Sequence, residues 1–279
     1  MQVGVFAKTF SGRDPATVLS AARAAGFDTV QYNMACSGLS SLPLEIADDV
    51  ADAVVAAAAE CGIRVGAVSA TYNMIHPMTE RLEHGRRAAE AIAASARRMG
   101  AGVVTLCTGS ADPLDQWRYH PDNSSWRSWR LLMREFEFLI PLAERHDLVL
   151  GVEPEMGNVV SSAHLARTLL DTLRSERVGI VVDPANLVEP ADIERGRNNI
   201  REAIDLLGDR IIMAHAKDRK ADGSFAAAGK GIIDFDEFIS DLRSVGFNGP
   251  IVAHGCDDAE APGVAAFLRG RLNEAALVA

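Results

Sequence analysis

Side chains that can bind a metal ion stand at the ends of four strand-like segments in the second half of the sequence. The segments cover residues 149–153, 179–183, 211–215 and 250–254, and they end on Glu153, Asp183, His215 and His254. These four residues are 30, 32 and 39 positions apart, and each interval is about the length of one strand–helix unit. If the strands are consecutive in a barrel, the four side chains converge at its carboxyl end, where such barrels keep their chemistry. Two carboxylates and two imidazoles at one point predict a divalent-metal site.

The rest of the sequence supplies the elements that such a barrel needs. Short β-branched runs alternate with helical stretches rich in Ala, Leu and Arg, as is typical of βα units around a parallel sheet. Four further strands are expected at residues 2–6, 28–32, 63–68 and 103–107. Helices are expected from residue 14, at 45–61, 79–99, about 123–145, 162–173, 197–207, 236–244 and 263–272. No stretch resembles a linker, so residues 1–279 are predicted to form one (β/α)8 TIM barrel in the α/β class.

Composition and charge narrow the class of partner. The net charge of −10 argues against nucleic acid, which needs clustered Lys and Arg to bind phosphates. No apolar run approaches the length of a membrane span. The N-terminus has no basic region followed by an apolar stretch, and the cysteines form no CxxC pair, so we expect a cytoplasmic protein with free thiols. A small-molecule partner is favoured, and the sequence is compatible with a homo-oligomer.

Several motifs resemble one known superfamily. GVEPE, VVDPANL, HAKD and GKGIIDFDEFISDLRSVGFNGPIVAH, preceded by ATYNMIHP and RRMGAGVVTLCTGS, are similar to motifs of the xylose-isomerase-like barrels. The likeness is strongest to the sugar phosphate isomerase/epimerase group, which includes hydroxypyruvate isomerase-like and tagatose epimerase-like enzymes. It covers about residues 3–272. The resemblance implies a sugar or sugar derivative as substrate and one divalent metal ion as cofactor.

The resemblance also implies roles for individual residues. Glu153 matches a glutamate that binds the metal and exchanges a proton with the substrate. Asp183 and His215 match metal ligands, and Lys217 matches a lysine that contacts the substrate. Glu155, two residues after Glu153, has a weaker claim and could simply shape the mouth of the barrel.

The sequence departs from the family pattern at two positions. The family often has a histidine where this chain has Asn186, and an amide can bind a hydroxyl but cannot carry a proton. The eighth strand usually ends on a glutamate that is a ligand and the second acid/base, whereas here it ends on His254. Imidazole suits Mn²⁺, Zn²⁺ or Fe²⁺ better than Mg²⁺. His254 is therefore expected to be either a metal ligand or a proton-transfer group, since a bound metal occupies the lone pair that would accept the proton.

Loops after the strands supply further candidates for substrate binding. A long loop follows the fourth strand, and loops of this length are often lids or binding loops. The substrate-binding residues predicted from the loops and strand ends are His76, Trp117, His120, Asn158, Asn186 and Lys217.

The function favoured by the sequence is a metal-dependent sugar isomerase or epimerase, with Glu153 and His254 as the catalytic pair. The reaction would proceed by removal of a proton next to a metal-bound carbonyl, giving an enediolate. Three alternatives stay open: a metal-dependent lyase or hydrolase of a modified or oxidised sugar, a non-catalytic sugar-binding barrel and, with least support, an endonuclease IV-like repair enzyme. No cradle rich in Arg or Gly is evident for phosphate, which favours non-phosphorylated substrates.

Overall fold

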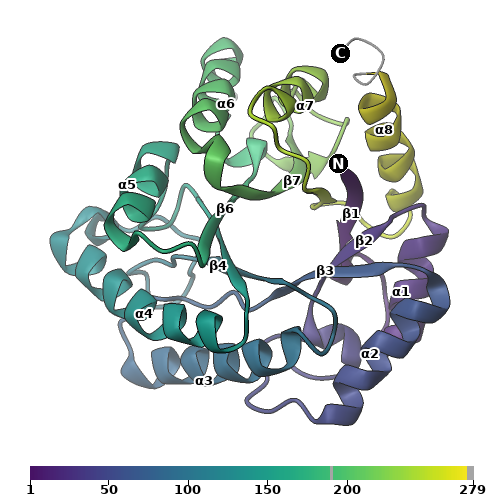
Figure 1. Cartoon of the computed structure of the whole chain (residues 1–279). Coiled ribbons are helices and arrows are strands. Elements are labelled where there is room, and N and C mark those ends of the chain that lie inside the picture. The colour runs from purple at the N-terminus through teal and green to yellow at the C-terminus, as the bar shows by residue number, and fades with distance from the viewer. Residues whose placement is uncertain (189–190, 275–279) are drawn as a thin grey trace.

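A ring of parallel strands forms the centre of the molecule (Figure 1). The computed structural model describes residues 1–188 and 191–274, and within these residues eight parallel strands pair side by side and close through the β1–β9 and β6–β7 pairings. The barrel strands are β1 (Gln2–Phe6), β2 (Thr29–Tyr32), β3 (Arg64–Ser69), β4 (Val103–Cys107), β5 (Val149–Glu153), β6 (Val178–Val182), β7 (Ile211–Arg219) and β9 (Pro250–Ala253). This closure confirms the predicted (β/α)8 TIM barrel. The predicted single domain also included residues 189–190 and 275–279, which lie outside the described residues.

The α-helices lie around the outside of the strand ring (Figure 1). They are α1 (Pro15–Ala24), α2 (Asp48–Cys61), α3 (Thr79–Ala96), α4 (Trp126–Arg145), α5 (Ala163–Leu173), α6 (Ile193–Leu207), α7 (Phe235–Ser244) and α8 (Ala261–Glu274). Helix α1 begins as predicted at Asp14-Pro15, because the Asp14 carboxylate accepts a hydrogen bond from the backbone N–H of Thr17 at 2.9 Å. Helix α6 begins four residues earlier than predicted, because Asp192 caps it in the same way. Among the described residues, no helix is long and apolar enough to cross a membrane.

The hydrophobic core lies mainly between the strands and the helices. Apolar residues of every barrel strand contribute to it, and the β6 strand is buried along its whole length. A smaller cluster fills the inside of the barrel and consists of Ala67, Val181, Met213 and Val252. Because the interior is packed with side chains, the space available to a ligand is at the carboxyl mouth, as is general for this fold.

Short elements shape that mouth. Four 3₁₀ helices follow barrel strands or lie in their loops: η1 (Ala7–Thr9), η2 (Met34–Ser37), η3 (Pro121–Ser124) and η4 (Pro184–Asn186). A fifth, η5 (Gly208–Arg210), precedes β7. The sequence did not predict that β7 would extend to Arg219 and pair in antiparallel fashion with a short strand, β8 (Phe225–Ala227). This hairpin rises above the mouth on the β7 side.

Asp218 of the HAKD motif anchors the segment that follows the hairpin. Its fully buried carboxylate accepts hydrogen bonds from the backbone N–H groups of Gly229, Gly231 and Ile233 at 2.9–3.1 Å. A side chain at Gly231 would come within 2.3 Å of the Asp218 carboxylate, so only glycine fits there. The HAKD and GKG motifs are thus one local structure, which fixes the hairpin beside the mouth.

Candidate metal and sugar site

Three of the four predicted metal ligands lie together at the carboxyl mouth. Glu153 is the last residue of β5, Asp183 directly follows β6, and His215 lies within β7. One ligand atom from each of the three lies within 4.8 Å of the other two. Consecutive parallel strands bring these residues together, as the intervals in the sequence indicated.

His215 is held from both sides of its ring. Its Nδ1 lies 3.1 Å from Oε1 of Glu153 and 4.0 Å from Oδ2 of Asp183. Its Nε2 lies 2.9 Å from Oε1 of Gln31, whose amide nitrogen donates to the Thr105 hydroxyl at 3.1 Å. With its amide nitrogen on Thr105, Gln31 presents Oε1 to the ring, and Nε2 of His215 donates to it. Nδ1 is therefore the atom directed at the two carboxylates.

Asp183 has a carboxylate oxygen that suits a cation. Its Oδ1 accepts a hydrogen bond from the backbone N–H of Ala185 at 2.9 Å. Its Oδ2 is buried and accepts no hydrogen bond from the part of the chain that the structure describes, and the Lys217 ammonium lies 3.5 Å away. A buried carboxylate oxygen without a donor is costly unless a cation is bound. Two carboxylates with one imidazole form a donor set that fits Mn²⁺, Fe²⁺ or Zn²⁺.

Neighbouring charges set the protonation of the site. Burial works against ionisation of Glu153, yet the positive charges of His215 and Lys217 outweigh it and lower its pKa to about 2. Burial, together with the charge of Glu153, raises the pKa of Glu155 to about 8. Burial also raises the pKa of Asp183. Glu153 is therefore the more acidic of these two neighbouring carboxyl groups, and Glu155 is the one that holds its proton more readily.

His254, the fourth predicted ligand, directly follows β9 and lies outside the group of three. Its ring stacks on Phe6 with the centroids 4.5 Å apart, and it lies at a tilt against the His215 ring at 4.7 Å. Burial and the nearby His215 lower the pKa of His254 to about 3, so its imidazole is neutral. Its role as a metal ligand or proton-transfer group stays a prediction.

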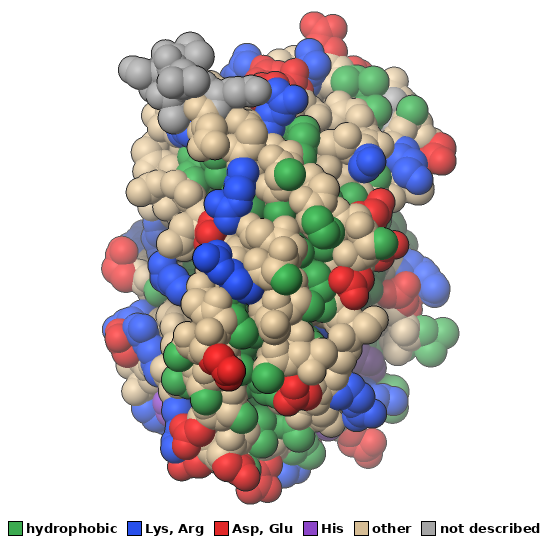
Figure 2. Space-filling model, turned by 90° about the vertical axis from the view of Figure 1, so that its right-hand side faces the viewer, with side chains coloured by type: hydrophobic (Ala, Val, Ile, Leu, Met, Phe, Trp, Pro, Cys, Tyr) green, Lys and Arg blue, Asp and Glu red, His purple; other side chains and the backbone are tan. Residues whose placement is uncertain are grey.

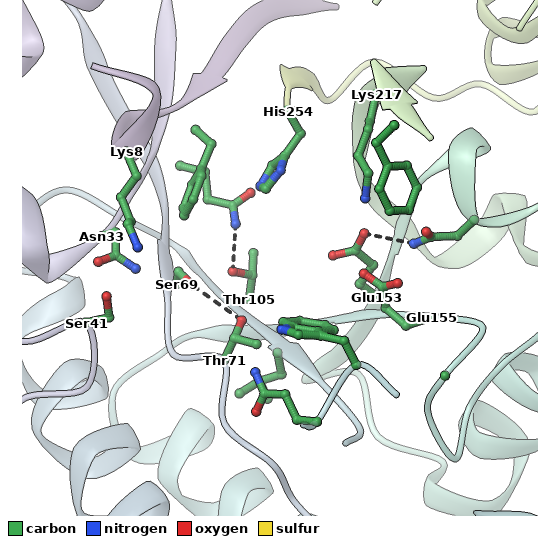
Figure 3. A pocket seen from close by; sticks show the side chains of 18 of the residues that line it. Lys8, Asn33, Ser41, Ser69, Thr71, Thr105, Glu153, Glu155, Lys217 and His254 are labelled. Carbon is green, nitrogen blue, oxygen red and sulfur yellow. Dashed lines mark hydrogen bonds between the residues drawn. The ribbon is translucent and has the colours of Figure 1, made fainter. Parts of the chain in front are cut away.

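A cavity of about 570 Å³ opens at the mouth of the barrel, lined by Glu153 of the metal-ligand group and by His254 (Figure 3). This volume lies within the range for small-molecule sites. Its walls combine aromatic or apolar side chains with hydroxyl and amide groups. The former include Phe6, Trp117, Met156 and Phe225, and the latter include Gln31, Asn33, Ser41, Ser69, Thr71, Thr105 and Gln116. Flat apolar faces next to many hydrogen-bonding groups suit a polyhydroxylated ligand.

Three of the predicted substrate-binding residues line this cavity, namely Trp117, Asn186 and Lys217. Asn186 donates to Oε1 of Glu153 at 3.2 Å. Lys217 lies between Asp183 and the Phe225 ring, with its ammonium 3.8 Å from the ring centroid.

The other three predicted substrate-binding residues lie elsewhere. His76 lines a neighbouring cavity, and its Nδ1 accepts a hydrogen bond from the backbone N–H of Met78 at 3.0 Å. His120 caps η3 by accepting from the backbone N–H of Asp122. Asn158 is buried and uses both ends of its amide on backbone groups, accepting from Gly109 at 2.7 Å and donating to Gln116 at 2.8 Å. None of these three described residues lines the cavity that Glu153 lines, and their contact with a substrate stays a prediction.

Several residues of the site escaped the sequence analysis. Lys8 and Asn33 follow β1 and β2, and both line the cavity. The strand-end rule that found Glu153 would also have found these two, but neither residue type stood out as a ligand. Gln31 lies inside β2, where nothing in the sequence distinguishes it from a core polar residue. Phe225 belongs to the hairpin that was not predicted.

The comparisons with known proteins agree with this architecture. A family model described as xylose isomerase-like TIM barrel matches residues 19–270, and the chain belongs to this family. No curated protein matches the chain.

Solved structures of related barrels superpose on nearly the whole chain. The apo structure of 3-keto-D-glucoside 4-epimerase from E. coli has a TM-score of 0.76 at 19% identity, covering 97% of this chain and 99% of that one. D-allulose 3-epimerase from Methylomonas sp. has a TM-score of 0.73 at 16% identity, covering 97% and 98%. A xylose isomerase-like protein from Mycobacterium smegmatis in complex with magnesium has a TM-score of 0.70 at 16% identity, covering 98% and 97%. At these identities the likeness establishes the fold.

Proposed function

We propose that the protein is a divalent-metal-dependent isomerase or epimerase of a sugar or sugar derivative. The observation that carries the proposal is the buried group of Glu153, Asp183 and His215, whose Glu153 lines a cavity with aromatic and hydroxyl groups in its walls. Among the similar structures are sugar epimerases, one of them in complex with D-allulose. Membership of the xylose isomerase-like family adds to this support.

Glu153, Asp183 and His215 would hold the ion, and His254 is proposed as a fourth ligand. When bound, the ion would act as a Lewis acid that polarises a sugar carbonyl. Mn²⁺, Zn²⁺ or Fe²⁺ suits the two imidazoles better than Mg²⁺ does.

The protein's own groups would then move the proton. Glu153 would act as the base that removes a proton from the carbon next to the carbonyl, because its carboxylate is ionised and opens into the cavity. Lys217, beside Asp183, would stabilise negative charge that develops on the substrate oxygen. Aromatic faces at Trp117 and Phe225 would pack on the sugar and exclude water.

Isomerisation makes smaller demands on this site than epimerisation. Transfer of a proton between neighbouring carbons needs one base on one face, and Glu153 supplies it. Epimerisation needs a second group on the opposite face, and His254, when not ligated, is the proposed proton-transfer group because it lies beside His215 at the same cavity. A homo-oligomer stays our expectation, which light scattering of the purified protein would check.

Deuterium exchange tests the proposed reaction. The purified protein is supplied with Mn²⁺ and incubated in D₂O with a panel of aldoses and ketoses, and the products are examined by NMR. Deuterium at the carbon next to the carbonyl, without loss of a fragment, is the expected result. Glu153→Gln should lower the exchange rate by about 10²–10⁴-fold, the range for loss of a general base.

Other outcomes separate the rival functions. Loss of water or another fragment would instead indicate a lyase or hydrolase. Tight sugar binding without exchange by the wild type would indicate a non-catalytic binding barrel.

A further inference from the structure

A second polar group lies across the cavity from the metal-ligand group. Lys8 belongs to η1 after β1, and Asn33 and Ser41 belong to the loop after β2. In the closed ring of eight strands, β1 and β2 stand opposite β5 and β6, which carry Glu153 and Asp183. Figure 3 shows the labelled Lys8, Asn33 and Ser41 on one side of the cavity and Glu153, Glu155 and Lys217 on the other.

Within residues 1–188 and 191–274, the Lys8 ammonium and the Asn33 amide nitrogen of this second group donate no hydrogen bond to another side chain or carbonyl. Among the described residues, no carboxylate lies within 4.0 Å of the Lys8 ammonium, whereas Lys217 pairs with Asp183. Asn33 uses its Oδ1 to accept from the backbone N–H of Ala35 at 3.0 Å, and its amide nitrogen faces the cavity (Figure 3). The local fold thus directs the donor end of the amide, rather than its acceptor end, toward a ligand.

We propose that Lys8, Asn33 and Ser41 bind a carboxylate or phosphate at the far end of the substrate, which makes the substrate an acidic sugar derivative. This inference rests on the proposed function. An ammonium, an amide N–H and a hydroxyl offer several donors to one oxyanion. This group lies across the cavity from Glu153, so an oxyanion held by it would leave the other end of the substrate at Glu153. This proposal revises the preference for non-phosphorylated sugars drawn from the sequence, because residues from the segments after β1 and β2 replace a continuous phosphate cradle.

Binding of matched neutral and acidic sugars tests the proposal. Calorimetry on the metal-loaded protein would compare the binding of D-glucose with that of D-glucuronate, and the binding of D-fructose with that of D-fructose 6-phosphate. The wild type should bind one acidic member about 10- to 100-fold more tightly than its neutral partner, as a hydrogen-bonded charge pair provides. A tighter affinity for D-glucuronate would indicate a carboxylate site, and a tighter affinity for the phosphate ester would indicate a phosphate site.

Variants locate the effect. Lys8→Met should reduce the preference to about twofold or less, while Lys8→Arg should keep most of it. Lys230→Met is the matched control, because Lys230 is exposed and does not line the cavity. Thermal unfolding of each variant would verify that it is folded.

The proposal is overturned if neutral and acidic sugars bind the wild type equally. It is also overturned if the preference survives in Lys8→Met but disappears when the metal is removed, which would place the oxyanion at the metal-ligand group instead. These are binding measurements, so they are independent of turnover. Deuterium exchange into neutral sugars alone would leave the proposed function standing while this inference fails.

Discussion

Gln31 contacts His215 on the ring nitrogen that faces away from the carboxylates. The Gln31 amide nitrogen donates to Thr105 and its Oε1 accepts from Nε2–H of His215, which leaves Nδ1 as the ring atom that would face a bound metal. Hydrogen bonds of this kind orient metal-bound histidines and are often worth 10- to 100-fold in metal affinity.

We therefore expect Gln31→Leu to lower the affinity for Mn²⁺ by about 10- to 100-fold, since Leu keeps the approximate volume but cannot accept from Nε2. Titration followed by electron paramagnetic resonance of free Mn²⁺ would measure this. Gln31→Glu retains the acceptor and should restore the affinity. Equal loss in both variants would mean that Gln31 acts through packing and not through His215.

At the residue scale, the sequence predicted Glu153, Asp183 and His215 because a ligand-type side chain at the end of an apolar strand is a strong signal. It could not predict Gln31, since its part in the site depends on a contact between β2 and β7, 184 residues apart in the chain. His76 and His120 were predicted from their residue type and their place in loops at the mouth. In the structure the Nδ1 atom of each accepts a backbone hydrogen bond within its own loop.

At the scale of elements, two loops build the wall that carries Trp117. Gly157 allows the loop after β5 to approach the backbone of Trp117, because a Cβ atom at this position would lie 2.0 Å from the Trp117 carbonyl oxygen. Asn158 donates to the backbone carbonyl of Gln116, and Asn123 donates to that of Gly157 at 2.7 Å. Asn158, expected to bind substrate, thus positions the residues that line the cavity.

Asn158→Ala should loosen the loop that carries Gln116 and Trp117, because the side chain that binds the Gln116 backbone is removed. Loss of one buried and one partly buried hydrogen bond should destabilise the protein by about 1–3 kcal/mol and make Trp117 more accessible to solvent. Urea unfolding would measure the first effect and acrylamide quenching of tryptophan fluorescence the second. Asn198→Ala, at an exposed position of α6, is the control and should change neither. Unchanged quenching in Asn158→Ala would contradict the positioning role.

The sequence predicted the barrel strands and helices better than the short elements between them. Alternation of strand and helix predicted all eight βα units, because each strand is an apolar run bounded by turn residues. The β7–β8 hairpin was missed because β8 has three residues, of which only Phe225 has high strand propensity. Its position depends on the four backbone groups that bind Asp218, which local propensity cannot predict.

At the scale of the whole molecule, buried polar contacts join neighbouring βα units. The Tyr72 hydroxyl, after β3, donates to the buried Glu135 of α4 at 3.0 Å, and Arg86 of α3 pairs with the same carboxylate. A side chain at Gly85 would meet the Tyr72 ring at 2.2 Å, so this glycine makes room for the contact. The β3–α3 and β4–α4 units are thereby held together beneath the surface. Figure 2 shows that one outer face of the molecule carries mixed charges.

This contact predicts a pH effect on stability. Burial and the charge of Glu135 raise the pKa of Tyr72 well above 10.0, so the folded chain keeps a proton that the unfolded chain releases. Stability should therefore fall as the pH rises above about 10. Tyr72→Phe should lose about 1.5–3 kcal/mol near pH 8, the range for hydrogen bonds to charged groups, and then fall less steeply with pH. Urea unfolding of both proteins from about pH 8 to 11 would check this, and parallel curves would contradict it.

The central claim, a metal site at the mouth of the barrel, is tested most directly by metal analysis. Elemental analysis would be made on the purified wild type and on Glu153→Ala, Asp183→Ala and His254→Ala, before and after dialysis against Mn²⁺ or Zn²⁺. We predict about one ion per chain in the wild type and its loss from the Glu153 and Asp183 variants. Loss from His254→Ala as well would make His254 a ligand, and retention would leave it free for proton transfer. A wild type that neither carries nor takes up metal, or an Asp183 variant that binds it equally well, would contradict the account.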